Sequence, residues 1–440
     1  MTAKRQVRQP AEATRGRRNP EPAPPICYHG GLFTFYEIAM PKNKRPAPRK
    51  PVKQAAEPDH DALAQNLVDL ALEITEREDL EPAVLASREQ DVLTLVRRAL
   101  RRKHDELLYG AIELARYTDP VACRWLRDKI EEEAATLRTR EGDEDFEIDA
   151  FMIPLFVTST GGLVEADVFR DDAAFEELID SFRQAGLASA DARVVLVRHL
   201  YDLDEVEAVR YSDLQDMLRE AFGSMRSKKL VAAPAIEASM RGWQPGLADA
   251  HEEAMELRFL FGFSLKHADD PFYRVPKDED AADTYFEGRL TRYRMWAGSI
   301  TPLLQRNLSR APTTLDLNFL YQDLFYGARE QGVSELAMLA TLAEVNWRLD
   351  GQDLEPGRVK AVVAPIDAGE HASLRINLYA LGGGAPLATV DKAVDLADDL
   401  EIELEDLCDA LGSVGLDGVL VASGFDEDGQ PKGAEPYLTA

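Results

Sequence analysis

Three segments carry residue types that could do chemistry. The segment TSTGG at 158–162 follows an apolar run, and backbone amides in such a turn can hold a phosphate. The glycines at 382–384 could let the backbone approach a ligand closely. His267 stands with Asp269 and Asp270 just past a predicted strand, where metal ligands and general bases often lie. An enzyme with its site at the carboxyl ends of the strands would need these three segments to converge.

Each of these segments also has a plain structural explanation. No lysine follows TSTGG, and neither G-x-x-x-x-G-K-S/T nor G-x-G-x-x-G surrounds it, so a turn at the end of a strand accounts for it. The glycine triplet suits a flexible connector, and a solvated loop accounts for the residues around His267. His199 falls at a strand end and is expected to be a half-buried histidine with a partner. G-x-S-x-G is absent, and Cys123 lies in a helical pattern. The sequence therefore assigns no catalytic residue, cofactor or metal ligand.

Acidic residues gather in four places, at 141–147, 278–283, 395–406 and 426–428. A divalent ion needs several oxygens that converge on one point, and the spaced pattern of a calcium loop is missing. Solvated faces and linkers are the expected role of these clusters, and 139–147 in particular is expected to be an acidic linker.

One dense basic cluster lies inside the chain, formed by Arg97, Arg98, Arg101, Arg102 and Lys103. Its place near the end of a predicted helix favours charge pairing with acidic neighbours and with the helix dipole. Contact with a nucleic acid is the alternative, and the two roles could combine with the basic tail.

Charge divides the chain sharply. The whole chain carries −28 and residues 1–53 carry +9, so residues 54–440 carry −37. Such an acidic body repels nucleic acids and anionic membrane surfaces over most of its area, so that only the tail or a local basic patch could bind a polyanion.

Composition predicts a cytoplasmic protein. The three cysteines, Cys27, Cys123 and Cys408, are too few and too scattered for a disulfide framework. No apolar run is long enough to span a membrane, and Ile26 to Met40 lacks the features of a signal peptide. Residues 1–39 show no helical or strand period, and Met40 opens a new basic stretch. We therefore expect Met40 to be the true start, with 1–39 an upstream extension of the reading frame; the alternative stays open.

Hydrophobic periodicity predicts an α/β to α+β fold, in which a helical N-terminal region precedes a mixed-sheet body. Strands are expected at 151–158, 193–200, 256–266 and 315–322, followed by a hairpin at 358–366 and 373–380 and a strand at 418–423. Helices are expected at 279–308 and 388–412, and behind four N-cap residues, Ser87, Asp119, Ser212 and Ser334. The predicted organisation is a disordered basic tail (1–58), a helical region (59–138), two α/β units (148–255 and 256–350), a C-terminal hairpin, helix and strand (356–424) and a turn-like tail (425–440).

The two α/β units have related spacing. The strands beginning at Arg193 and Leu315 are 122 residues apart, as are Ser212 and Ser334. A diverged duplication of a β-α-β-α unit explains this, and chance repetition of strand and helix is the alternative. The duplication predicts that both strands are central in their sheet and that Leu214 and Leu336 are both buried.

The segments RPAPRKPVKQ after Met40 and FMIPLFVTSTGG at 151–162 resemble an uncharacterised bacterial family, a domain of unknown function. The resemblance implies no activity. It favours Met40 as the start and a bacterial cytoplasmic origin.

Two functions remain open at this point, and the sequence does not decide whether the chain is an enzyme. The first is a binding or regulatory module whose acidic body engages a protein partner while its basic tail contacts a polyanion. The second is an enzyme of unknown class with a site at the carboxyl ends of the strands. Neither assigns an oligomeric state, and no membrane contact is expected.

Overall fold

The computed structural model describes residues 60–77, 81–159, 172–226, 254–308, 315–321, 325–367, 372–395, 399–416 and 418–437. The chain divides into two units, Met1–Glu57 and Pro58–Ala440, and all described residues belong to the second. The expected disordered tail and the choice of start residue lie outside the described residues, as do residues 160–162 of the first candidate turn.

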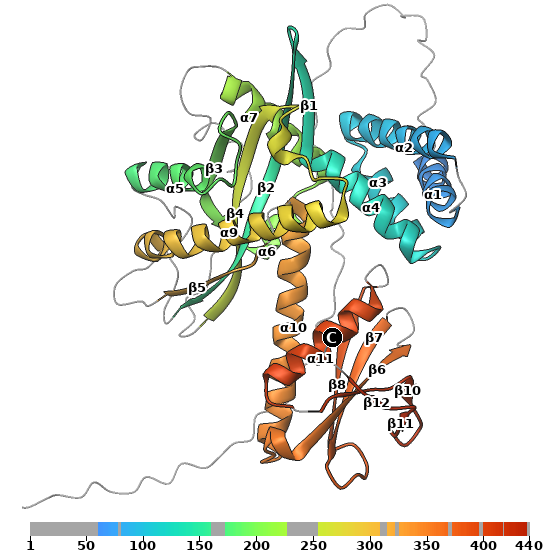
Figure 1. Cartoon of the computed structure of the whole chain (residues 1–440). Helices are drawn as coiled ribbons and strands as arrows, with labels where there is room; N and C mark the ends of the chain where they lie inside the picture. Colours follow the sequence, from blue (N-terminus) through green and yellow to red (C-terminus); the bar gives the residue numbers. More distant parts are fainter. Residues whose placement is uncertain are drawn as a thin grey trace, which may run out of the picture. The chain divides into compact units, whose positions relative to one another are not determined.

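The described chain begins with the expected helical region, formed by α1 (His60–Glu76), α2 (Pro82–Arg102), α3 (Asp105–Arg116) and α4 (Pro120–Ala135) (Figure 1). Asp119 caps α4 as predicted, because its carboxylate accepts the backbone N–H of Ala122 at 2.7 Å. The predicted cap at Ser87 is wrong. Helix α2 begins five residues earlier, at Pro82, whose fixed backbone angle suits the first helical position.

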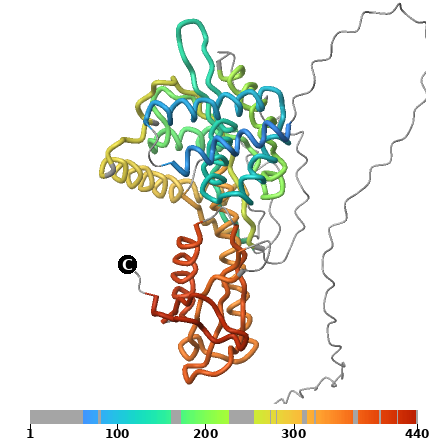
Figure 2. Tube along the Cα trace, turned by 90° about the vertical axis from the view of Figure 1, so that its right-hand side faces the viewer, coloured from blue at the N-terminus to red at the C-terminus, as the bar shows by residue number. Residues whose placement is uncertain are grey.

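The segment expected to be an acidic linker, 139–147, is a β-hairpin instead. Strand β1 (Thr136–Glu141) pairs with the start of β2 (Glu144–Ser159), and Figure 2 shows the turn between them, in teal, standing clear of the helices. Phe146 and Ile148 are buried while charged side chains occupy the other face, and Arg138 bonds Glu147 at 2.6 Å across the pair. Cross-strand charge pairing thus allows a sequence of linker-like composition to form strands.

A five-stranded antiparallel sheet forms the centre of this unit. Strand β2 pairs along its whole length with β4 (Ala254–His267), and β4 pairs on its other edge with β3 (Arg193–Tyr201). The second edge of β2 is shared by β1 and, further along, by β5 (Leu315–Phe319). Because each of these pairings is antiparallel and the helices are partly segregated, the fold is α+β.

Helices cover both faces of this sheet. In β2, Ile153 and Leu155 pack with α5 (Asp172–Gln184) and α9 (Glu279–Leu308), whereas Met152 and Phe156 belong to the core on the opposite face. That second core contains α7 (Tyr211–Arg226), the helices α1 to α4 and the start of α10 (Phe325–Gly351). Two short helices, α6 (Leu203–Glu207) and η1 (Pro271–Tyr273), follow β3 and β4. Successive side chains of β2 point to opposite faces, so this strand contributes to two separate hydrophobic cores.

The proposed duplication agrees with the order of the elements but not with the placement of the strands. The order β2-α5-β3-α7 recurs as β4-α9-β5-α10, apart from the short helices. Each second strand pairs with the first strand of the other unit, so β3 and β5 lie at edges rather than centrally, and both predicted units contribute to one sheet. The caps at Ser212 and Ser334 are wrong, since α7 begins at Tyr211 and α10 at Phe325. Leu214 is fully buried and Leu336 only partly, so common descent of the two units stays a prediction.

A second sheet follows, with the strand order β12-β9-β6-β7-β8. The hairpin is confirmed as β6 (Val359–Asp367) and β7 (Ala372–Ala380), which η2 (Pro356–Arg358) precedes. The helix expected at 388–412 is partly wrong. Alternating burial makes Ala388–Val394 the strand β8, and the helix α11 is Leu400–Ser413. The remaining strands are short: β9 (Leu420–Val421), β10 (Gly424–Phe425), β11 (Pro431–Lys432) and β12 (Glu435–Pro436). The C-terminal half of α10 packs with α11 against this sheet.

Candidate functional site

The segments predicted to converge in an enzyme site do not do so. Thr158 and Ser159 end β2, and His267 ends β4; because the two strands are antiparallel, Thr158 pairs with Met255 and His267 with Phe146. Twelve residues of β2 separate Thr158 from Phe146, which is roughly 40 Å at the usual rise of a strand. Thr158 and His267 thus lie at opposite ends of the sheet.

The glycine segment, 382–384, belongs to the other sheet. The glycines at 382–384 lie in the turn between β7 and β8, where Gly383 and Gly384 adopt φ angles of 79° and 121°. The carbonyl of Gly384 accepts a hydrogen bond from the Gln430 side chain at 2.9 Å. This turn therefore supports the C-terminal loop, and left-handed backbone geometry accounts for its glycines.

The histidine candidates have structural surroundings. The His267 ring lies 4.8 Å from that of Phe146, and Asp270 caps η1 by accepting the N–H of Phe272 at 2.9 Å. His199 is half-buried as predicted, with Nε2 3.2 Å from Glu205 Oε2. Among the described residues, no group of three or more His, Cys, Asp or Glu side chains is arranged to hold a metal ion. None of the helices in the described ranges is long and apolar enough to cross a membrane.

Two carboxylates of the acidic clusters, Asp278 and Asp426, bond to the local backbone. Asp278 accepts the N–H of Ala281 at the start of α9, at 3.2 Å. Asp426 accepts the N–H groups of Asp428 and Gln430, at 3.0 and 2.7 Å, and so closes a turn. These two carboxylates accept backbone N–H groups at a helix start and in a turn, a local role that the expectation of solvated faces and linkers did not include.

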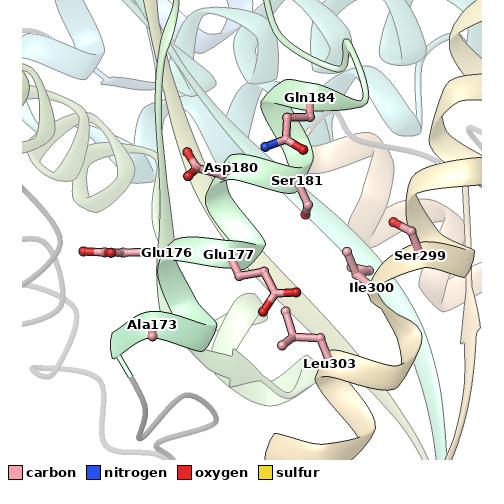
Figure 3. Close-up of a pocket in the computed structure, with 9 residues that line it drawn as sticks. All are labelled: Ala173, Glu176, Glu177, Asp180, Ser181, Gln184, Ser299, Ile300 and Leu303. Atoms are coloured by element: carbon pink, nitrogen blue, oxygen red, sulfur yellow. The ribbon is translucent and has the colours of Figure 1, made fainter.

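A groove of about 500 Å³ lies between α5 and α9 (Figure 3). In the figure Glu177 points toward Ile300 and Leu303, while Glu176 and Asp180 point away from α9. The groove's nine lining residues include three carboxylates but no histidine, cysteine, lysine or arginine. The two lining serines, Ser181 and Ser299, each donate the hydroxyl to a backbone carbonyl at 2.7 Å, and the lining holds no basic side chain that could activate them.

Two of the five residues of the basic cluster, Arg97 and Lys103, pair with carboxylates, as the structural explanation predicts. Arg97 makes two hydrogen bonds of 2.6 Å to Glu133, which also bonds Arg138. Lys103 forms an ion pair with Asp216, and Arg101 donates to the carbonyl of Arg97. These contacts tie the end of α2 to α4 and α7.

The remaining arginines of the cluster, Arg98 and Arg102, lie near two histidines from neighbouring helices. Helix α2 ends at Arg102, and the next residue, Lys103, has a φ of 56° that turns the chain directly into α3, with His104 at the junction. The ring of His104 lies 4.6 Å from that of His60, the first residue of α1. Together with the exposed Arg98 and Arg102 on α2, these histidines form a group of two guanidinium and two imidazole side chains. We call His60, Arg98, Arg102 and His104 the cationic patch.

The cationic patch lacks acidic partners in the described part of the chain. No side-chain ion pair or hydrogen bond joins any of its four members to a described carboxylate, although Asp61 and Glu106 are exposed on the same helices. The nearest buried carboxylate, Asp105, accepts the N–H and the hydroxyl of Ser212 instead. The described residues therefore provide no paired carboxylate for its two arginines.

The surroundings of His104 lower its pKa. Burial lowers the pKa of His104 below its ordinary value of 6.5, and the nearby positive charges of His60, Arg102 and Arg98 lower it further. Asp105 acts in the opposite direction, but more weakly. An anion placed among these groups would relieve the repulsion and favour protonation of His104. The patch can therefore bind an anion through guanidinium and imidazolium N–H groups.

Comparison of the chain with protein-family models, curated proteins and solved structures finds no match. The resemblance to an uncharacterised bacterial family thus stays a prediction. Sequence analysis identified Arg98 and Arg102 but missed His60 and His104. The run RRKH at 101–104 held a signal for His104, whereas the approach of His60 is a tertiary contact without a local pattern.

Proposed function

We propose that this protein is a binding module that contacts a nucleic acid through the cationic patch, with the basic residues 1–53 adding to the attraction. One observation carries the proposal: two arginines and two histidines from three helices lie together without an acidic partner among the described residues, on a chain whose net charge is −28. Unpaired positive charge is costly to gather, and a polyanion would compensate it.

The residue types favour phosphate as the group that is recognised. Arg98 and Arg102 carry planar guanidinium groups, which match phosphate oxygens in a two-pronged hydrogen bond. Spacing by four residues places both on one face of α2, and His60 and His104 extend the positive surface to α1 and α3. Several phosphates along a strand fit such a row better than one small anion does.

The acidic body limits how the contact is made. Residues 54–440 carry −37, so a long duplex laid along the surface would be repelled outside the patch. A flexible single strand can touch the patch and leave the acidic surface, and we therefore propose a single-stranded nucleic acid as the partner. The acidic surface is left for the protein partner that the sequence suggests.

An enzyme remains the alternative proposal, but its supporting observation is missing from the described residues. TSTGG and His267 lie at opposite ends of one sheet, and the glycines at 382–384 lie in another. Binding is therefore the function that the geometry supports best.

Fluorescence anisotropy with a labelled single-stranded oligonucleotide tests the proposal. Arg98→Gln combined with Arg102→Gln is expected to weaken binding about tenfold or more, since each charge-assisted contact contributes about 1 kcal/mol or more. The matched control is Arg183→Gln with Arg306→Gln, two exposed arginines on α5 and α9 whose loss changes the net charge equally. Equal weakening by both pairs, or competition by polyglutamate as strong as by unlabelled oligonucleotide, would contradict the proposal.

A further inference from the structure

Two reciprocal ion pairs join α4 to α10. Glu131 of α4 lies 3.2 Å from the Arg329 guanidinium of α10, and Arg127 of α4 lies 3.3 Å from Glu330 of α10. The two carboxylates differ in exposure, since the Glu131 side chain is 7% exposed and that of Glu330 is 39% exposed. Glu131 is thus the buried member of a four-charge contact between the helices.

Aromatic side chains surround this contact. Tyr211 of α7 and Tyr326 of α10 are both buried, and their rings lie 5.6 Å apart. The Arg329 guanidinium carbon lies 5.1 Å from the centre of the Tyr326 ring. The Tyr326 hydroxyl, which is buried, has no hydrogen-bond partner among the described residues. The ionised form of Glu131 therefore has one close cation and little other polar support.

The balance of these surroundings favours the neutral carboxylic acid. The pKa of Glu131 is raised to about 7, mainly by burial and in smaller part by the negative charges of Glu330 and Asp128. Arg329 and Arg127 act in the opposite direction without outweighing the burial. Glu131 therefore changes its charge near neutral pH, unlike an exposed glutamate.

Helix α10 connects this contact to the second sheet. Its start, Phe325, packs in the core beneath the first sheet, and Gly332 lies so close to β4 that an added Cβ would come within 2.9 Å of Leu257. Further along the same helix, Val345 and Leu349 pack in the core of the second sheet. A change in how firmly α4 holds α10 would therefore reach both cores.

We propose that Glu131 is a proton-sensitive latch between α4 and α10, which holds α10 in place when it is protonated and loosens it when it is ionised. The sign follows from linkage. In the packed state the carboxyl is buried, whereas separation of the helices would expose it to water, where ionisation is easy. The packed state thus binds the proton more tightly, and rising pH favours separation. The ionisable groups that face Glu131 are Arg127, Asp128, Arg329, Glu330, Tyr211 and Tyr326.

Hydrogen exchange read by mass spectrometry on peptides from the first half of α10 tests the latch, after correction for intrinsic exchange rates. Between pH 6 and pH 8 the local opening constant is expected to increase about tenfold in the unmodified chain. Glu131→Gln is expected to abolish this pH response. Glu132→Gln, an exposed neighbour on α4, should keep it. The latch is contradicted if the response is absent, or if it persists in Glu131→Gln.

A second variant separates the latch from a general loss of packing. Arg329 lowers the pKa of Glu131, so Arg329→Gln is expected to move the midpoint of the pH response to higher pH. Peptides from β6 and β7 provide a reference for global opening. A pH response of the same size in those strands and in α10 would show global unfolding and overturn the proposal.

Discussion

Ser212 and Asp105 are joined by two hydrogen bonds although they lie in different helices. The Asp105 carboxylate accepts the backbone N–H of Ser212 at 2.9 Å and its hydroxyl at 2.5 Å. Both residues are buried. The serine that resembles a helix cap in the sequence therefore attaches α7 to the first turn of α3, directly beside the cationic patch.

This contact predicts unequal effects for two serines that the sequence makes equivalent. Ser212→Ala is expected to lower the free energy of unfolding by about 1.5–3 kcal/mol, because it removes a buried hydrogen bond to a carboxylate. Ser334→Ala, inside α10, is expected to change it by less than about 0.5 kcal/mol. Urea unfolding of both variants measures the difference. Equal effects would restore the capping interpretation.

Gly262 occupies a place on β4 where no side chain fits. A Cβ there would come within 2.4 Å of the Phe151 ring and within 2.8 Å of Leu196. Gly262→Ala is therefore expected to destabilise the protein by about 1–3 kcal/mol through overpacking. Gly223→Ala on α7 is the control, since nothing lies within 4 Å of its added Cβ, and alanine there should be neutral or stabilising by about 0.5–1 kcal/mol. Thermal melting of the two variants checks this, and a neutral Gly262→Ala would contradict the packing of β2 on β4.

Glu131 predicts a specific pH dependence of stability. Its pKa is raised from 4.5 to about 7 in the folded chain, so its stabilising contribution is fully present below pH 4.5 and is lost as the pH rises through 7. The shift corresponds to about 3 kcal/mol. The free energy of unfolding is to be measured for the unmodified chain and for Glu131→Gln. The difference, unmodified minus variant, should decrease between pH 5 and pH 8. A difference that stays constant over this range would show that Glu131 is not buried as described.

The cationic patch predicts that nucleic acid binding strengthens as the pH falls. The pKa of His104 lies below 6.5, so its positive charge develops mainly in acid, and a bound phosphate favours that charge. Affinity for the oligonucleotide is expected to rise between pH 7.5 and pH 5.5, and His60→Gln with His104→Gln should reduce the rise. His267→Gln is the control, because this histidine is exposed at the end of β4, away from the patch. Loss of the pH response in the control would instead assign it to His267.

The period of the apolar residues correctly predicted one strand and one long helix. The apolar alternation of 256–266 and the helix at 279–308 are present in the structure, the helix with the same bounds. The start of α10 could not be predicted from Gly327 and Gly332, which suggest a loop. Gly332 is instead required by the close approach to Leu257, a tertiary contact. Strand β3 pairs with β4 of the second predicted unit, and β5 pairs with β2 of the first. No local pattern indicates this, because the whole sheet determines which strands pair.

The residues of the candidate site could also be predicted only in part, because their pairing depends on tertiary contacts. The basic run of α2 identified Arg98 and Arg102, but composition could not show that Arg97 and Lys103 are paired with Glu133 and Asp216 while those two arginines are not. The convergence expected of TSTGG and His267 assumed that their strands run in the same direction. Antiparallel pairing separates them.

The salt dependence of oligonucleotide binding tests the central claim most directly. Each phosphate contact on a single strand contributes roughly 0.7 to the slope of log affinity against log salt concentration. If Arg98 and Arg102 each contact a phosphate, their joint replacement by glutamine should lower that slope by roughly 1.4, whereas the Arg183→Gln and Arg306→Gln pair should leave it unchanged. An unchanged slope in the Arg98 and Arg102 variant would contradict the account, because it would show that the cationic patch does not touch the nucleic acid.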